Sequence, residues 1–151
     1  MKPTSALTGL IALIMLSACD EGSGVTPGFV KGPIAKSTIQ FARSQGAILT
    51  QIHGKVLGLQ DAALREKVLP LIAGSLGRKL FKFTMQAGSA GVGDVSFRIA
   101  FGYPKGEQND RLCTDKIPEL APEEKDITAI GALCNDGELL AEASGGLLLR
   151  R

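Results

Sequence analysis

The sequence predicts an α+β domain in which an amphipathic helix covers one face of an antiparallel sheet. Three observations support this fold class. Apolar residues recur about every four positions between residues 61 and 80, which is the spacing of one helix face. Between residues 81 and 103, apolar residues instead alternate with polar ones, as in a half-buried strand. Near the end, two β-favouring runs flank an Asp-Gly pair, which is a strong hairpin signal.

The chain begins with the three parts of an export signal in their usual order. Lys2 supplies a positive charge, the run from Ala6 to Met15 is mostly apolar, and small residues follow just before Cys19. This run is too short for a transmembrane helix, which needs roughly 20 apolar residues. We therefore interpret residues 1–18 as a cleavable signal peptide.

The tetrapeptide Leu16-Ser17-Ala18-Cys19 resembles the lipobox of bacterial lipoproteins. The resemblance implies that Cys19 becomes the N-terminus and carries several acyl chains, which together hold a protein stably on a membrane. The alternative is an ordinary signal peptide that happens to contain a cysteine. The resemblance covers residues 1–19 and does not extend to the folded domain.

The same resemblance implies a location in the cell envelope, with the domain facing the periplasm. Asp20 is similar to the residue that retains lipoproteins in the inner membrane of enteric bacteria. Most lipoproteins of double-membraned bacteria nevertheless reach the outer membrane, which we favour over the inner one. The membrane, through the lipid on Cys19, is the first expected partner, an envelope protein is the second, and the compartment excludes nucleic acid.

The remaining chain fits one domain behind a short linker. Residues 20–28 are polar apart from Val25, so that residues 19–28 are expected to form the lipidated cysteine and a flexible tether. Residues 29–151 are enough for a single domain with its own core.

The beginning of this domain has the least clear pattern. Residues 38–41 and 48–56 alternate in polarity, which predicts two strands separated by Ser44-Gln45-Gly46. A helix over residues 37–58 fits loosely, but Gly46, Gly54 and Gly58 weaken it. We favour the strands and leave the helix as the alternative.

The central helix is predicted over residues 61–80, with Asp61 as its N-cap and a kink or a new start at Pro70. Strands are predicted next, over residues 81–86 and 94–103, with the glycine-rich stretch 87–93 between them. So short a connection predicts an antiparallel hairpin. The stretch lacks the Gly-Lys-Ser/Thr ending of a phosphate-binding loop, so we assign it to turn geometry.

Two cysteines remain after Cys19, and an exported chain meets an oxidising compartment. We therefore expect a disulfide between Cys113 and Cys134; a metal site or a free thiol pair is the alternative. Cys113 lies in an irregular, proline-containing stretch, and Cys134 ends the first strand of a final hairpin spanning residues 126–149. The disulfide would then attach the irregular stretch to the end of that hairpin.

Charge is distributed unevenly along the chain. Residues 29–105 hold 11 basic and 3 acidic residues, whereas residues 106–149 hold 3 basic and 10 acidic ones. The two halves either interleave in the fold and neutralise each other or form a bipolar surface, with a basic face toward anionic lipid or an acidic partner. Arg78, Lys79 and Lys82 are the candidate basic surface.

We find no residues to assign to catalysis, to a cofactor or to a metal. His53 is the single histidine, and it has no serine elbow motif to act with. Glu107, Asn109, Asp110 and Asp115 could surround a calcium ion, but their spacing matches no EF-hand. The sequence thus predicts a non-enzymatic accessory subunit that binds a protein or lipid. A small-ligand binder or inhibitor of an envelope enzyme is the alternative, and a hydrolase is the third hypothesis.

Overall fold

The computed structural model describes residues 24–56, 58–60, 62–63, 65–68, 82–121 and 126–148. Four predictions fall partly or wholly outside these ranges: the signal peptide, the lipidated Cys19, most of the helix over residues 61–80, and the side chains of Arg78 and Lys79. Within the described part of the chain, no helix is long and apolar enough to cross a membrane.

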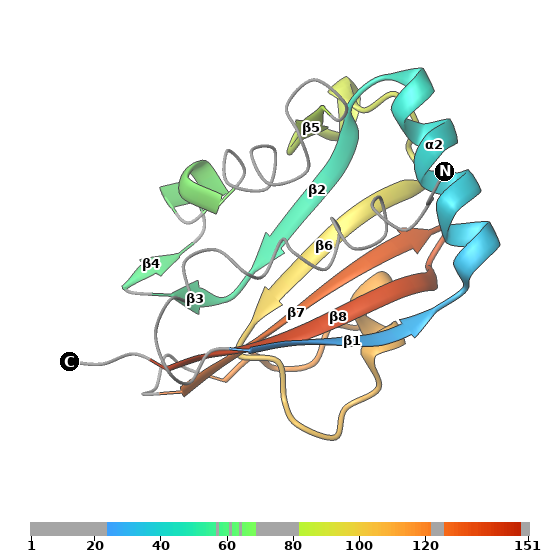
Figure 1. Cartoon of the computed structure of the whole chain (residues 1–151). Coiled ribbons are helices and arrows are strands. Elements are labelled where there is room, and N and C mark those ends of the chain that lie inside the picture. The colour runs from blue at the N-terminus through green and yellow to red at the C-terminus, as the bar shows by residue number, and fades with distance from the viewer. Residues whose placement is uncertain are drawn as a thin grey trace.

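The centre of the molecule is a six-stranded mixed sheet (Figure 1). Its strand order is β1-β8-β7-β6-β2-β5. The strands are β1 (Gly24–Val30), β2 (Ile48–His53), β5 (Phe83–Thr84), β6 (Val95–Phe101), β7 (Asp126–Asn135) and β8 (Glu138–Leu148). A separate two-stranded sheet joins β3 (Lys55–Val56) and β4 (Leu59–Gln60). The described helices with assigned bounds are the α-helix α2 (Gly32–Gln45) and the 3₁₀ helices η2 (Ala87–Ser89) and η3 (Asn109–Cys113).

The fold is therefore α+β, but the expectation of an antiparallel sheet was wrong. Strands β1, β8, β7 and β6 are antiparallel neighbours, whereas β2 runs parallel to both β6 and β5. The predicted hairpin between residues 81–86 and 94–103 does not form, because β2 lies between β5 and β6. Ile48, Leu49 and Ile52 of β2 are buried, and a strand with apolar residues on both faces belongs inside a sheet.

Residues 38–41, which we expected in a strand, belong to helix α2. Pro33 stands in the first turn, where a missing N–H costs nothing. Ala35 and Ala42 are spaced by two turns and are buried against the sheet. The second predicted strand of this region is confirmed by β2 and β3.

The final hairpin is confirmed, and its turn follows from local chemistry. Asp136 and Gly137 both have positive φ, 49° and 77° respectively. A two-residue type I′ turn requires this at both central positions, and Asp and Gly are the residues that tolerate it. The result is the long antiparallel pair β7–β8, which forms the middle of the sheet.

Strand β1 begins earlier than expected. We predicted a tether up to residue 28, but Gly24 is already paired with Gly146 of β8. The pairing adds an edge strand to the sheet and leaves residues 20–23 between Cys19 and the first described strand.

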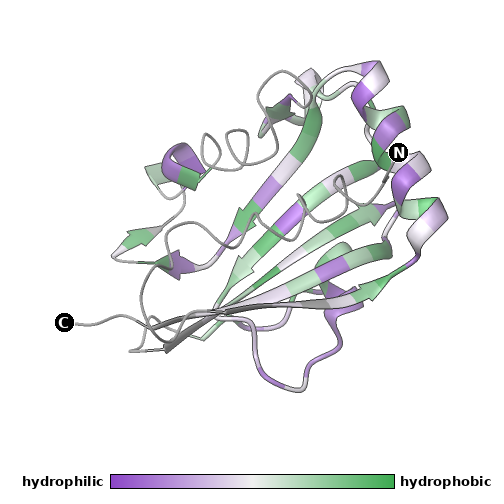
Figure 2. Cartoon of the chain, in the orientation of Figure 1, coloured by the Kyte–Doolittle hydropathy of each residue, from purple (hydrophilic) through white to green (hydrophobic). Residues whose placement is uncertain are grey.

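The two faces of the sheet have different covers. On the helix face, α2 packs over Phe97, Ile99, Leu133 and their neighbours. We expected the helix over residues 61–80 to cover the sheet; of its described residues, Val68 does pack against this core. On the opposite face, residues 104–121, here called the excursion, fold back over Ala100, Ile130 and Ala132 through η3. Figure 2 shows apolar residues along the strands and polar ones along the excursion.

Candidate functional site

The excursion is the most elaborately held polar surface in the described part of the chain. Its two ends lie side by side, because the Ala121 N–H donates a hydrogen bond of 2.7 Å to the Gly102 carbonyl. The predicted disulfide is present between Cys113 of η3 and Cys134 of β7, with the two Cα atoms 5.4 Å apart. Both cysteines are buried. The excursion is thus attached to the sheet at its ends and at its centre.

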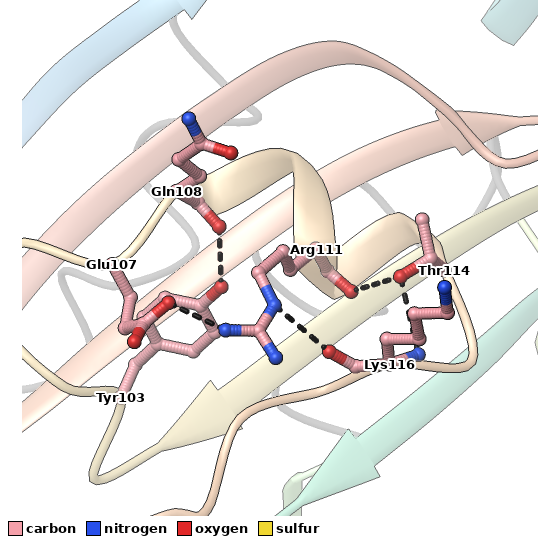
Figure 3. A network of polar contacts seen from close by, with 6 residues as sticks. All are labelled: Tyr103, Glu107, Gln108, Arg111, Thr114 and Lys116. Carbon is pink, nitrogen blue, oxygen red and sulfur yellow. Dashed lines mark hydrogen bonds and ion pairs between the residues drawn. The ribbon is translucent and has the colours of Figure 1, made fainter.

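Tyr103 anchors the start of the excursion. Its side chain is 2% exposed and packs with Leu112 and Cys113 in the core of this face. Its hydroxyl donates a 2.7 Å hydrogen bond to the Gln108 carbonyl, as Figure 3 shows. Burial raises the pKa of Tyr103, with the Arg111 charge acting in the opposite direction. The phenol therefore stays protonated and keeps this donor at neutral pH.

Arg111 holds the next part of the excursion together (Figure 3). Its Nη1 lies 2.6 Å from Glu107 Oε2, and its Nε donates to the Lys116 carbonyl at 3.1 Å. The Thr114 hydroxyl donates to the Arg111 carbonyl at 2.9 Å. The Glu107 carboxylate is therefore committed to Arg111. In the described residues, no three His, Cys, Asp or Glu side chains converge as a metal site would require.

Arg98 of β6 attaches the excursion to the sheet through its guanidinium group. Its Nη1 donates to the carbonyls of Leu112 and Thr114, at 3.1 and 3.2 Å. Its Nε donates to the Ser96 hydroxyl at 3.2 Å. Five donors in a planar guanidinium make such a branched contact possible. Arg98 therefore binds its own strand at Ser96 and the excursion at Leu112 and Thr114. These bonds support the conformation of η3.

His53 lies at the end of β2, in register with Ala100 of β6. Its Nε2 is buried and has no hydrogen-bond partner among the described residues. Burial lowers the pKa of His53, and the charges of Arg98 and Arg65 lower it further. The imidazole is therefore neutral at pH 7.

Glu142 of β8 contacts the neighbouring edge strand, β1. Its Oε1 accepts a 3.3 Å hydrogen bond from the Phe29 N–H, while its Oε2 is buried without a partner in the described part of the chain. A Cβ atom at Gly28 would lie 2.6 Å from the Glu142 side chain. The glycine therefore leaves the space that this carboxylate occupies.

The charge prediction is tested at few positions. Lys82 is exposed, whereas Arg78 and Lys79 lie outside the described residues, so the candidate basic surface stays a prediction. Lys31, from the basic half, forms an ion pair with Glu138, from the acidic half. At this point the two halves interleave.

Sequence reasoning missed one surface feature. Phe29, Ile34 and Phe41 are the large apolar side chains exposed in the described residues, at 49%, 55% and 55%. Two of them lie on α2, of which we had predicted residues 38–41 as a strand. Pro33 followed by an Ala35–Ala42 spacing of seven was the signal that could have indicated this helix.

Comparison with protein-family models, with curated proteins and with solved structures finds no match for this chain. The site must therefore be interpreted from its own geometry. That geometry is a rigid, charged loop surface on one face of the sheet and an apolar and basic helix surface on the other.

Proposed function

We propose that the protein is a bacterial envelope lipoprotein anchored through Cys19, and that its domain is a non-enzymatic accessory subunit that binds a protein partner through the excursion. The lipobox-type signal supports the anchor. The fixed conformation of the excursion supports the binding role, and it is the observation that carries this proposal.

An 18-residue segment with one short 3₁₀ helix is long for a connection in a compact domain. Here it is held by a disulfide, by Tyr103, and by two arginines that bind its carbonyls. Long loops that a scaffold holds in one conformation commonly carry binding function. A preorganised loop also loses less conformational entropy when it binds.

The exposed side chains of the excursion indicate the type of contact. They carry charges of both signs and include Lys105, Asp110, Asp115, Lys116 and Glu119. A partner would therefore meet this surface largely through polar contacts, as in the rims of non-obligate interfaces. Electrostatic complementarity of this kind favours specificity over raw affinity.

The anchor is tested by replacing its cysteine. Cys19→Ser should abolish incorporation of a radiolabelled fatty acid into the protein and leave an unprocessed precursor on immunoblots. The matched control is Ser17→Ala, which keeps a small residue before the cysteine and should be labelled normally. Labelling of the Cys19→Ser protein would refute the anchor.

The binding role is tested by photo-crosslinking in cells of the source organism. A benzophenone amino acid at Asp110, which is exposed in η3, should give a discrete crosslinked band containing an envelope protein. The same group at Lys55, exposed in β3 and outside the excursion, is the control. A benzophenone at Glu119, which is also exposed in the excursion, is the second probe. Crosslinking at position 55 equal to that at position 110, or no crosslinking at either position 110 or position 119, would refute the excursion as the binding surface.

A further inference from the structure

His53 lies on the same face of the sheet as the excursion. Ile52, the residue before it in β2, packs with Phe101 on the helix face, and successive residues of a strand point to opposite faces. His53 is paired with Ala100 of β6, which belongs to the core under the excursion. The imidazole therefore lies beside the segment that we propose as the binding surface.

Arg98 is a close neighbour of His53 on this face. Gln51, two positions before His53, is paired with Arg98. Side chains two positions apart on one strand share a face, so Arg98 and His53 are diagonal neighbours on adjacent strands. The Arg98 guanidinium binds the carbonyls of Leu112 and Thr114. The group that attaches the excursion to the sheet is therefore close enough for its charge to lower the pKa of His53.

A second proton on the imidazole has no suitable surroundings. A neutral imidazole has one N–H donor and one acceptor nitrogen, whereas the imidazolium has two donors. His53 Nε2 is buried and has no hydrogen-bond partner in the described part of the chain. The charged groups that act on the ring are the guanidinium groups of Arg98 and Arg65, and Asp115 of the excursion acts on Arg98. Protonation therefore leaves a donor without an acceptor and a charge that two cations repel.

We propose that His53 makes the excursion acid-sensitive: protonation of its imidazole displaces Arg98 from the carbonyls that it binds, and residues 114–121 then open from the sheet. This proposal rests on the proposed binding role of the excursion and adds its regulation. Acid then removes part of the binding surface, so a partner held at neutral pH is released.

The opening should be confined to the second half of the excursion. Strand β2, which carries His53, is paired on both sides within the sheet. Residues 114–121 contain no helix or strand, so they move more easily than β2 does. Residues 103–113 are held independently, by the Tyr103 hydroxyl and by the disulfide.

NMR of the intact ¹⁵N-labelled protein in detergent tests this directly. His53 is the single histidine of the chain, so one set of imidazole signals gives its titration midpoint. Backbone order parameters are measured at a pH above this midpoint and at a pH below it. For residues 114–121 we expect a fall from about 0.85, typical of a rigid backbone, to below about 0.6. Those of η3 and β8 should stay high.

Two variants show whether His53 and Arg98 cause the change. His53→Gln stays uncharged, so residues 114–121 should remain rigid at both pH values. In Arg98→Met these residues should be mobile at both, and the imidazole should titrate at a higher pH because a neighbouring cation is gone. The proposal is overturned by rigid residues 114–121 below the midpoint in the wild-type protein, or by loss of order that is equal in β8. Acid-induced mobility in His53→Gln, or an unchanged midpoint in Arg98→Met, also overturns it.

Crosslinking from positions 110 and 119 separates this proposal from the proposed function. If a partner is crosslinked at neutral pH while residues 114–121 stay rigid below the His53 midpoint, the acid response is wrong and the binding role stands. If neither position gives a crosslink at neutral pH, the binding role is wrong, and its regulation by His53 falls with it.

Discussion

The two faces of the sheet are covered in different ways. On the helix face, α2 contributes Ala35 and Ala42 to a core of buried apolar side chains around Phe97. On the opposite face, the excursion contributes a disulfide, the phenol of Tyr103 and the carbonyls that Arg98 binds. A regular helix satisfies its own backbone, so it can cover a sheet with apolar contacts. An irregular segment leaves backbone groups unpaired, so side-chain donors such as Arg98 and Tyr103 bind its carbonyls. The disulfide holds the segment in place.

This difference means that the stability of the helix face should depend on packed volume, whereas that of the excursion face should depend on polar groups and the disulfide. The following four predictions test this comparison, starting with the largest expected effect.

Phe97→Ala should be the most damaging change. Phe97 is 4% exposed, and its ring centroid lies 6.5 Å from that of Phe83. Truncating a buried Phe leaves a cavity and costs about 3–5 kcal/mol of unfolding free energy. Urea denaturation followed by circular dichroism measures this loss. Phe29→Ala, which removes a half-exposed ring, is the control and should cost less than about 1 kcal/mol. Equal losses would contradict the assignment of Phe97 to the core.

Replacing both Cys113 and Cys134 with Ala should have the next largest effect. The cysteines are 21 residues apart in sequence, and the chain-entropy estimate for such a loop is about 3 kcal/mol. Amide hydrogen exchange should accelerate most in residues 104–121 and much less in α2. If exchange rises uniformly over both faces, the disulfide supports the whole domain and not the excursion in particular.

Arg98→Met should destabilise the protein by about 1–3 kcal/mol, because the carbonyls of Leu112 and Thr114 lose their donor while they stay covered. Arg98→Lys keeps the charge but supplies a point donor in place of a fork, so it should recover part of this loss. Chemical denaturation of the three proteins gives the ranking. Full recovery by lysine would show that charge, and not branched hydrogen bonding, is the contribution of Arg98.

The smallest effect concerns pH and His53. Because its pKa is lowered in the folded state, the unfolded chain takes up a proton first as the pH falls through about 6.5. This contribution to stability is therefore fully present above that pH and decreases below it, until the folded form is protonated as well. His53→Gln should flatten the stability profile between about pH 7.5 and about pH 5. An unchanged slope would show that His53 is not perturbed by burial.

Where short-range chemistry was decisive, the sequence was sufficient. The Asp136-Gly137 turn requires two residues that tolerate positive φ, and the flanking runs then pair with each other. The alternation around Phe97 predicted β6, and the even number of cysteines left after Cys19 predicted the disulfide. The turn and the alternation are set by residues close together in the sequence. The disulfide joins more distant residues, but it does so through a covalent bond.

The tertiary structure decided the strand order, the direction of β2 and the cover of each face. Strand β2 separates two segments that are neighbours in sequence, and α2 forms where residues 38–41 alternate like a strand. Short polarity patterns fit both helix and strand, so the choice depends on which pairing buries Ile48, Phe97 and Leu133 together. The excursion network was also unpredictable, because Arg98 and Tyr103 find backbone carbonyls that no side-chain pattern marks. Contacts between distant segments are set by the completed core, since burial of apolar area depends on all of its members at once.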